Sequence, residues 1–176
     1  MAERISLDLE EALLLSDTGS GDAFLALQEG VIDLMTTNQV DAAGAGISAE
    51  LFNSAIKALP TQYRRDMNSM RFYAAPNQVA DYRLAIAGRG TGLGDTAITT
   101  NNDIPVFGVP MRGVAQMPSS TILFTDPKNI LLGMQRNIRI ETDKNIQTRE
   151  YIIVATLRAA FQLEEEAASV KIKNIA

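Results

Sequence analysis

The stretch REYIIVATLRAAFQ, residues 149–162, decides how the rest of this sequence is interpreted. Its alternate positions are all apolar, and the positions between them turn polar toward the end; the apolar set is Tyr151, Ile153, Ala155, Leu157, Ala159 and Phe161. A period of two is typical of a β-strand with one buried face. At about 3.3 Å per residue the stretch would span about 46 Å. Since ordinary strands hold about 5–6 residues, the pattern predicts an element that extends past any small core.

A helix over residues 155–168 is the competing interpretation of this region. The run EEEAA at 164–168 is composed of good helix formers. We favour the strand because tyrosine, isoleucine, valine and threonine cluster at its start, and these residues prefer strands.

Upstream of this stretch the periodicity is mostly helical. Apolar residues at three- and four-residue spacing predict helices over 3–16, 23–36, 49–59 and 77–87. Asp22 and Ser48 are suitable N-caps, and Pro76 suits the first turn of the fourth helix, with Gly88 at its C′ position. Gly30 would cost about 1 kcal/mol inside the second helix, and we attribute it to close packing.

Most of the short β runs follow the helices, and one lies between the third and the fourth helix. They are predicted at 69–74, 106–114, 121–125, 130–134 and 138–141, with glycine and proline between the later ones. Helices come mostly first and strands second, which favours an α+β fold over the alternating pattern of a doubly wound sheet.

Composition excludes several classes of function. The chain has 176 residues, 46% of them hydrophobic, which is enough for one or two compact domains. It contains no cysteine and no histidine, which excludes thiol nucleophiles, Ser–His–Asp triads and, in practice, structural zinc. We therefore expect no enzyme activity and no cofactor.

Charge and hydropathy argue against a basic nucleic-acid-binding protein and against a membrane protein. The formal net charge is −5, which argues against a global basic field for nucleic acid. No apolar run reaches the roughly 20 residues that span a bilayer, and the start lacks the order of a signal peptide. We expect a soluble protein made in the cytoplasm, with no membrane partner.

A glycine-rich segment, GRGTGLGD at 88–95, opens a polar loop that extends to residue 103. It lacks the Gly-Lys-Ser/Thr ending of a Walker loop and the spacing of a dinucleotide-binding loop. Long loops of this kind are often functional, so we interpret it as a flexible subunit-contact loop. Its candidate contact residues are Arg89, Thr91, Leu93 and Asp95.

Other charged residues have plainer interpretations. Arg136, Arg139, Arg149 and Arg158 lack the interleaved aromatic residues of a nucleic-acid groove, so we predict that they form salt bridges between neighbouring subunits. The run Glu164-Glu165-Glu166 is expected to be solvated. No calcium-loop pattern is present, and we predict no metal site.

One region resembles a known family. Val109-Pro110, Met117-Pro118, Thr125-Asp126-Pro127-Lys128-Asn129 and Gly133-Met134-Gln135-Arg136 stand in order before a long strand with Arg158 and an Ala-rich final strand near 167–173. This arrangement resembles the C-terminal part of tailed-phage major capsid proteins with the Hong Kong 97-type fold. The specific part of the resemblance covers residues 105–160.

The resemblance implies a division of the chain and a function. Residues 1–18 and 137–160 would belong to the peripheral domain, as the end of its spine helix and its long strand. Residues 19–136 and 161–176 would form the axial domain. Such subunits form pentamers and hexamers that tile an icosahedral shell around DNA. Expected partners are other subunits, scaffold or decoration proteins and, only weakly and non-specifically, packaged DNA; the expected location is the virion.

The sequence departs from the family at its start. The N-terminal arm, the extended loop and most of the spine helix have no counterpart ahead of Met1, so we expect a truncated or processed chain or a prophage remnant. Some family members form a Lys–Asn isopeptide crosslink, but its lysine lies in the missing loop. We do not transfer that chemistry to this chain.

Two alternatives stay open at this point. A bacterial nanocompartment shell has the same fold and stores enzymes in place of DNA. A small acidic ligand-binding module would use carboxylates and the loop at 88–103.

Overall fold

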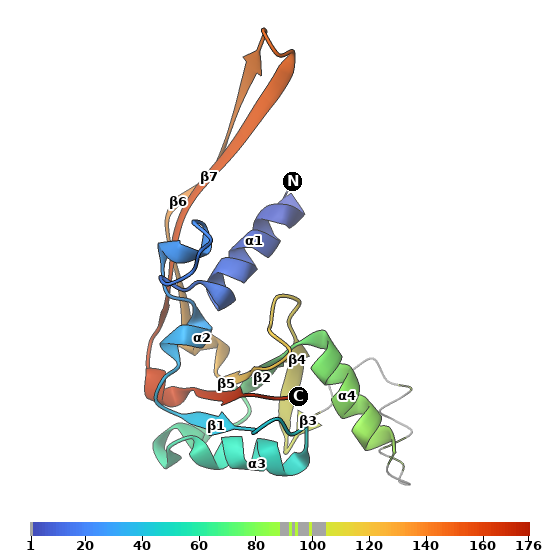
Figure 1. Cartoon of the computed structure of the whole chain (residues 1–176). Helices are drawn as coiled ribbons and strands as arrows, with labels where there is room; N and C mark the ends of the chain where they lie inside the picture. Colours follow the sequence, from blue (N-terminus) through green and yellow to red (C-terminus); the bar gives the residue numbers. More distant parts are fainter. Residues whose placement is uncertain (1, 89–91, 93, 95–98, 100–104) are drawn as a thin grey trace.

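The computed structural model describes residues 2–88, 92, 94, 99 and 105–176. A mixed sheet flanked by helices forms one end of the molecule, and a long two-stranded ribbon projects from it, with the first helix beside the base of the ribbon (Figure 1). None of the described helices is both long enough and apolar enough to cross a membrane.

The sheet has six strands in the order β1-β8-β5-β2-β4-β3. Their bounds are β1 Gln39–Asp41, β2 Arg71–Ala74, β3 Pro105–Val106, β4 Val109–Gly113, β5 Ile122–Thr125 and β8 Val170–Lys173. The pairs β1–β8 and β2–β4 are parallel, while β5 runs antiparallel to both of its neighbours. The last strand therefore lies between two earlier ones, and the sheet is complete only when the C-terminus is in place.

The helices cover the two faces of this sheet. They are α1 Ala2–Leu15, α2 Val31–Leu34, α3 Ala49–Ala58 and α4 Pro76–Ala87, with short 3-10 segments η1 Leu25–Leu27, η2 Thr61–Asp66, η3 Pro127–Asn129 and η4 Glu166–Ala168. The predicted caps hold for α3, where the Ser48 side chain accepts a hydrogen bond from the Leu51 N–H, and Pro76 is the first residue of α4.

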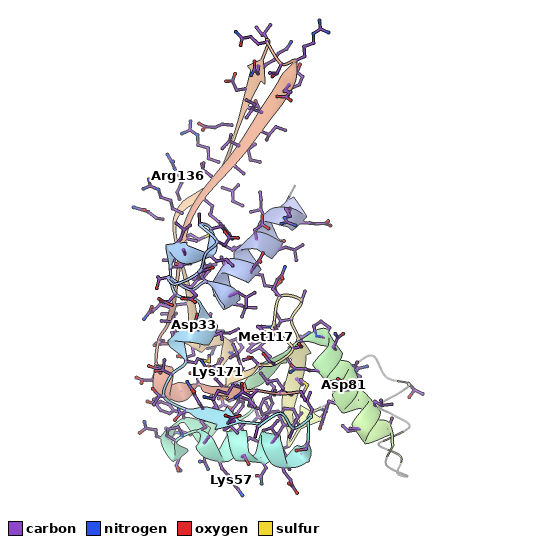
Figure 2. The ribbon with its side chains drawn as sticks, viewed as in Figure 1. Asp33, Lys57, Asp81, Met117, Arg136 and Lys171 are labelled. Carbon is purple, nitrogen blue, oxygen red and sulfur yellow. The ribbon has the colours of Figure 1, made fainter. Side chains whose placement is uncertain are left out.

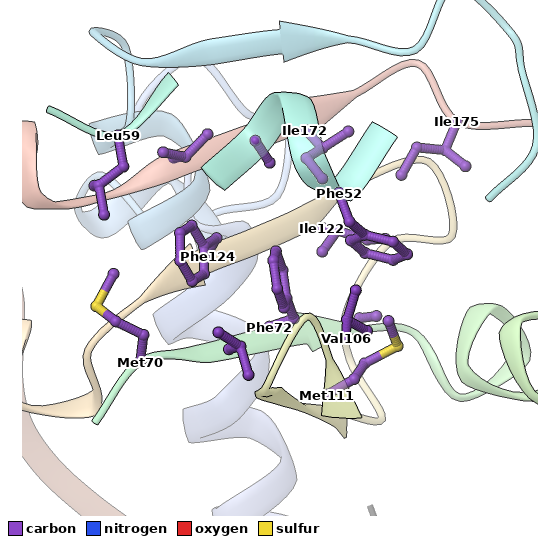
Figure 3. Close-up of a cluster of buried hydrophobic side chains, with 14 of the residues drawn as sticks. Phe52, Leu59, Met70, Phe72, Val106, Met111, Ile122, Phe124, Ile172 and Ile175 are labelled. Carbon is purple, nitrogen blue, oxygen red and sulfur yellow. The ribbon is translucent and has the colours of Figure 1, made fainter. Parts of the chain in front are cut away.

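Strand β5 lies in the middle of the core and is buried on both sides. Phe124 belongs to a cluster with Phe72 of β2 and Phe52 of α3, where the Phe72 and Phe124 rings stack 4.4 Å apart (Figure 3). Leu123 points to the opposite face, into a second cluster with Leu14 of α1 and Val31 of α2. This alternation along one strand links the two layers of helices through the sheet.

The long strand predicted at 149–162 is confirmed. Strand β7, Glu150–Leu163, pairs antiparallel with β6, Ile130–Asn145, to form the ribbon. The helix over 155–168 is wrong. The runs predicted at 130–134 and 138–141 are parts of the single strand β6, whose register shifts at two irregularities between Met134 and Arg139. The polar residues between the two runs concealed this continuity.

The helix predicted at 23–36 is also wrong, because the chain there forms only η1 and the four-residue helix α2. Gly30 separates them, with its N–H donating to the Ser16 carbonyl oxygen at 2.6 Å. A Cβ atom on Gly30 would lie 2.7 Å from the Leu14 carbonyl oxygen. The close packing predicted for this glycine is therefore confirmed, and the same contact displaces the segment from a continuous helix.

Smaller corrections concern the ends of elements. Gly88 has φ −67 and ends α4 in the right-handed region, so it is not the left-handed C′ residue that the sequence suggested. Strand β1 was not predicted, because its three residues follow the second helix pattern without a strand-like alternation.

Candidate functional site

The ribbon of β6 and β7 exposes large apolar side chains over most of its length. Ten of them between residues 131 and 154 have exposed fractions of 45 to 80%: Leu131, Leu132, Met134, Ile138, Ile140, Ile146, Tyr151, Ile152, Ile153 and Val154. A two-stranded hairpin is marginally stable in water by itself, and large apolar patches mark interaction sites. The ribbon is therefore suited to being covered by another surface.

Near its base, the apolar face of the ribbon is partly covered by α1. A groove of about 540 Å³ lies between α1, the η1 segment and β7. Its walls are mostly apolar and include Ile5, Leu9, Ala12, Phe24, Leu27, Ala155, Leu157, Ala159 and Phe161. Ser16 also lines it; its hydroxyl is buried and has no hydrogen-bond partner within the described part of the chain.

The opposite face of the ribbon carries charged side chains in addition to the exposed Ile152 and Val154. Cross-strand pairing places Arg136 directly opposite Arg158, between the two register shifts of β6. Arg139 lies further along the same strand and pairs with Glu141 at 2.8 Å. Both residues of that ion pair are more than half exposed, so the pair contributes little to stability in the isolated chain.

The outer end of the ribbon is a tight turn. Asn145 Oδ1 accepts a hydrogen bond from the Gln147 N–H at 3.1 Å, and Arg149 adopts a left-handed conformation with φ 56. Lys144 Nζ lies 5.7 Å from the centre of the Tyr151 ring, within reach of a cation–π interaction. The turn thus presents Arg149 and Lys144 away from the core.

At its inner end the ribbon joins the sheet through a corner held by polar contacts. Glu166 Oε1 accepts four hydrogen bonds of 2.6 to 2.8 Å, from the backbone N–H and the hydroxyl of both Thr36 and Thr37. These hydrogen bonds, led by those from the side chains of Thr37 and Thr36, lower the pKa of Glu166 from its ordinary value of 4.5 to about 2. For Glu166, the expectation of a solvated side chain is wrong.

Asn129 holds the same corner from the other side. Its side-chain amide donates to the Glu165 carbonyl oxygen at 2.9 Å and accepts from the Glu165 N–H at 2.8 Å. Because Asn129 is buried, the direction in which the ribbon leaves the sheet is defined by paired hydrogen bonds and not by a loose linker.

Sequence reasoning missed a group of three carboxylates, Asp17, Glu29 and Asp33, whose oxygens lie within 4.8 Å of one another. Burial raises the pKa of Asp33, and the negative charges of Asp17 and Glu29 raise it further, against the lowering effect of Lys171. Oxygen ligands of this kind suit Mg²⁺ or Ca²⁺, although exposed acidic groups often gather without an ion. Asp17 follows α1, Glu29 lies between η1 and α2, and Asp33 lies in α2, so no spacing in the sequence reveals them.

The structure brings only part of the predicted contact set together. Arg136, Arg139 and Arg158 lie near one another on the ribbon, whereas Arg149 lies at its tip. Arg89, Thr91, Leu93 and Asp95 lie outside the described residues.

The family model described as the phage capsid family matches residues 1–174. A curated protein of Bacillus subtilis (strain 168), "Putative prophage capsid protein YqbE", is 38% identical over 187 residues, which cover 99% of this chain and 60% of that protein. The chain thus spans about three-fifths of this relative's length.

Solved structures with a similar fold are parts of assembled particles. The satellite phage P4 procapsid subunit has a TM-score of 0.70 at 16% identity, covering 99% of this chain and 61% of its own. The capsid of the native GTA particle gives 0.68 at 18% identity, with 99% and 70% covered. The SrpI encapsulin complex of Synechococcus elongatus gives 0.65 at 13% identity, with 99% and 63% covered.

Proposed function

This chain belongs to the phage capsid family, and from that premise we propose that it is a structural subunit of a phage or prophage head shell. Its fold is the predicted α+β architecture of Hong Kong 97-type capsid shells. The family implies a structural and not an enzymatic role.

The observation that carries the proposal is the exposed apolar ribbon. Its Ile140 and Ile153 are about half exposed. Removing apolar surface of this kind from water lowers the free energy by roughly 25 cal/mol per Å². Contact with adjacent subunits would cover the ribbon. We propose that these contacts produce pentamers and hexamers that tile an icosahedral shell.

The proposed division of the chain follows the same geometry. Residues 1–18 and 137–160 would form the peripheral domain, and residues 19–136 and 161–176 the axial domain. In support, α1 packs beside the base of the ribbon, while the main hydrophobic cluster lies within the sheet and its helices (Figure 1).

Further partners are proposed from the family alone. They are scaffold or decoration proteins and DNA held weakly and without sequence preference, in a virion assembled from subunits made in the bacterial cytoplasm. The chain's net charge of −5 is compatible with a shell that encloses DNA without binding it tightly.

A second candidate is a nanocompartment shell, which the similarity to an encapsulin supports. The relative named as a prophage capsid protein favours the phage head. Genes for a terminase and a portal protein beside the gene for this chain would support the head, and a gene for a cargo enzyme would support the compartment.

Assembly tests the main proposal. We expect the purified chain to form closed particles or rings in electron micrographs and in light scattering. Ile153→Asp should abolish them without unfolding the subunit, because Ile153 is half exposed. Leu84→Asp on α4, where the leucine is also exposed, is the matched control and should assemble. A chain that stays monomeric at high concentration would refute the proposal.

A further inference from the structure

The arginine pair on the ribbon is an unusual arrangement of charge. Arg136 of β6 and Arg158 of β7 are direct cross-strand partners, so their side chains leave the ribbon on the same face. Both are exposed, and within the described residues neither has an ion-pair partner. Like charges placed directly opposite each other destabilise a strand pair.

The backbone around this pair is irregular. The register shifts on both sides of Arg136, between Met134 and Arg136 and again between Arg136 and Arg139. Bulges of this kind re-aim side chains and commonly occur at functional positions. Two adjacent irregularities therefore set the direction of the Arg136 side chain, although it has no ion-pair partner among the described residues of its own subunit.

Charge is distributed unevenly along the sequence. Residues 1–35 carry eight acidic and one basic side chain, whereas residues 130–163 carry five basic and three acidic ones. The remaining residues hold ten of each sign. The ribbon is thus the basic element of an acidic chain, and the N-terminal region is its electrostatic complement.

Within one subunit these two regions meet at the groove against α1, whose lining is mostly apolar but includes Asp8. The groove against α1 is lined by Ala155, Leu157 and Ala159 of β7, and Arg158 alternates with them to the other face of the strand. Figure 2 places Arg136 on the side of the ribbon away from α1. Among the described residues, no ion pair joins the acidic region of the same chain to the arginine pair.

We infer that Arg136 and Arg158 form a carboxylate-binding pair for the acidic N-terminal surface, residues 3–33, of a second copy of this chain. The inference rests on the proposed function and names one contact between subunits. Guanidinium groups bind carboxylates through two parallel hydrogen bonds, and an anion between the two arginines removes their repulsion. Such a contact joins different surfaces of the two copies, so repetition closes a ring when the rotation permits.

Charge reversal tests the pair. The variant R136E/R158E is compared with K57E/R65E, which makes the same change in net charge at exposed residues of α3 and η2. We expect the first variant to lower the association constant of the full chain about tenfold or more, and the control to leave it within about twofold. Sedimentation measures association, and thermal unfolding verifies that each variant is folded.

A mixing experiment identifies the partner surface. D17K/D33K reverses two exposed carboxylates of the N-terminal surface, and we expect it to associate weakly alone. Its equimolar mixture with R136E/R158E should associate more strongly than either variant, since the charges are complementary again. Association of the unaltered chain should also weaken between about 50 mM and about 500 mM NaCl, a measurement that requires no variant.

Three results would overturn the inference. If R136E/R158E associates as strongly as the unaltered chain, the arginine pair is not part of the interface, and the proposed function is unaffected. If R136E/R158E keeps its association constant but no longer binds a DNA fragment, the arginine pair binds phosphate and not carboxylate. An unaltered chain that never associates refutes both this inference and the proposed function.

Discussion

Replacing Glu166 with glutamine tests the corner between ribbon and sheet. The carboxylate accepts four hydrogen bonds on one oxygen, two from hydroxyls and two from backbone N–H groups of Thr36 and Thr37. An amide retains one acceptor oxygen but loses the charge that strengthens these bonds. It also brings an N–H₂ group toward neighbouring donors.

The lowered pKa of Glu166 sets an upper limit on what its charge contributes to the free energy of unfolding. A change from 4.5 to about 2 corresponds to about 3 kcal/mol, at 1.36 kcal/mol per unit. Glu166 is only partly buried, and solvent screening reduces such contributions. We expect Glu166→Gln to lower the free energy of unfolding by about 1 to 2 kcal/mol at pH 7, which corresponds to about 3–6 °C in Tm.

The pH dependence has a defined sign. The folded-state pKa of Glu166 is depressed, so its contribution is fully present above the unfolded value of 4.5 and is lost as pH falls toward about 2. Urea unfolding of both proteins, followed by circular dichroism, should show a stability difference that shrinks over that interval. Glu164→Gln is the control, because Glu164 is exposed. Equal losses in the two variants, or a difference that does not change with pH, would refute this reasoning.

Two further substitutions test the packing around α1. Gly30→Ala should lower the free energy of unfolding by about 2 to 3 kcal/mol, because its Cβ would lie 2.7 Å from the Leu14 carbonyl oxygen. Gly46→Ala is the control, because a Cβ at that position has nothing within 4 Å. Thermal unfolding compares the two variants, and equal Tm values would contradict this explanation. Ser16→Ala should raise the free energy of unfolding by about 1 kcal/mol, because it removes a buried hydroxyl that lacks a partner within the described residues; a lower Tm than that of the parent chain would contradict it.

The fold class and the long strand could be predicted because their signals are local. Alternation along β7, the caps and apolar spacing of α3, and Pro76 at the start of α4 depend on residues within a few positions of one another. The length of the strand predicted that it extends past the core, but its pairing with a single strand β6 and the exposure of its apolar side chains were not predicted. Among the candidate contacts, Arg136, Arg139 and Arg158 proved to be neighbours only through strand pairing, and their role in subunit contact stays a prediction.

What the sequence determined by itself is the set of elements whose period and end signals agree: α1, α3, α4, β5 and the strand β7. Tertiary structure decided where those elements meet. Gly30 against Leu14 separates η1 from α2, Glu166 reaches Thr36 across 130 positions, and pairing in the ribbon sets Arg136 opposite Arg158. Helix and strand propensities act over a few residues. Register, close approach and long-range hydrogen bonds instead depend on which distant surfaces pack together, and no local pattern encodes that choice.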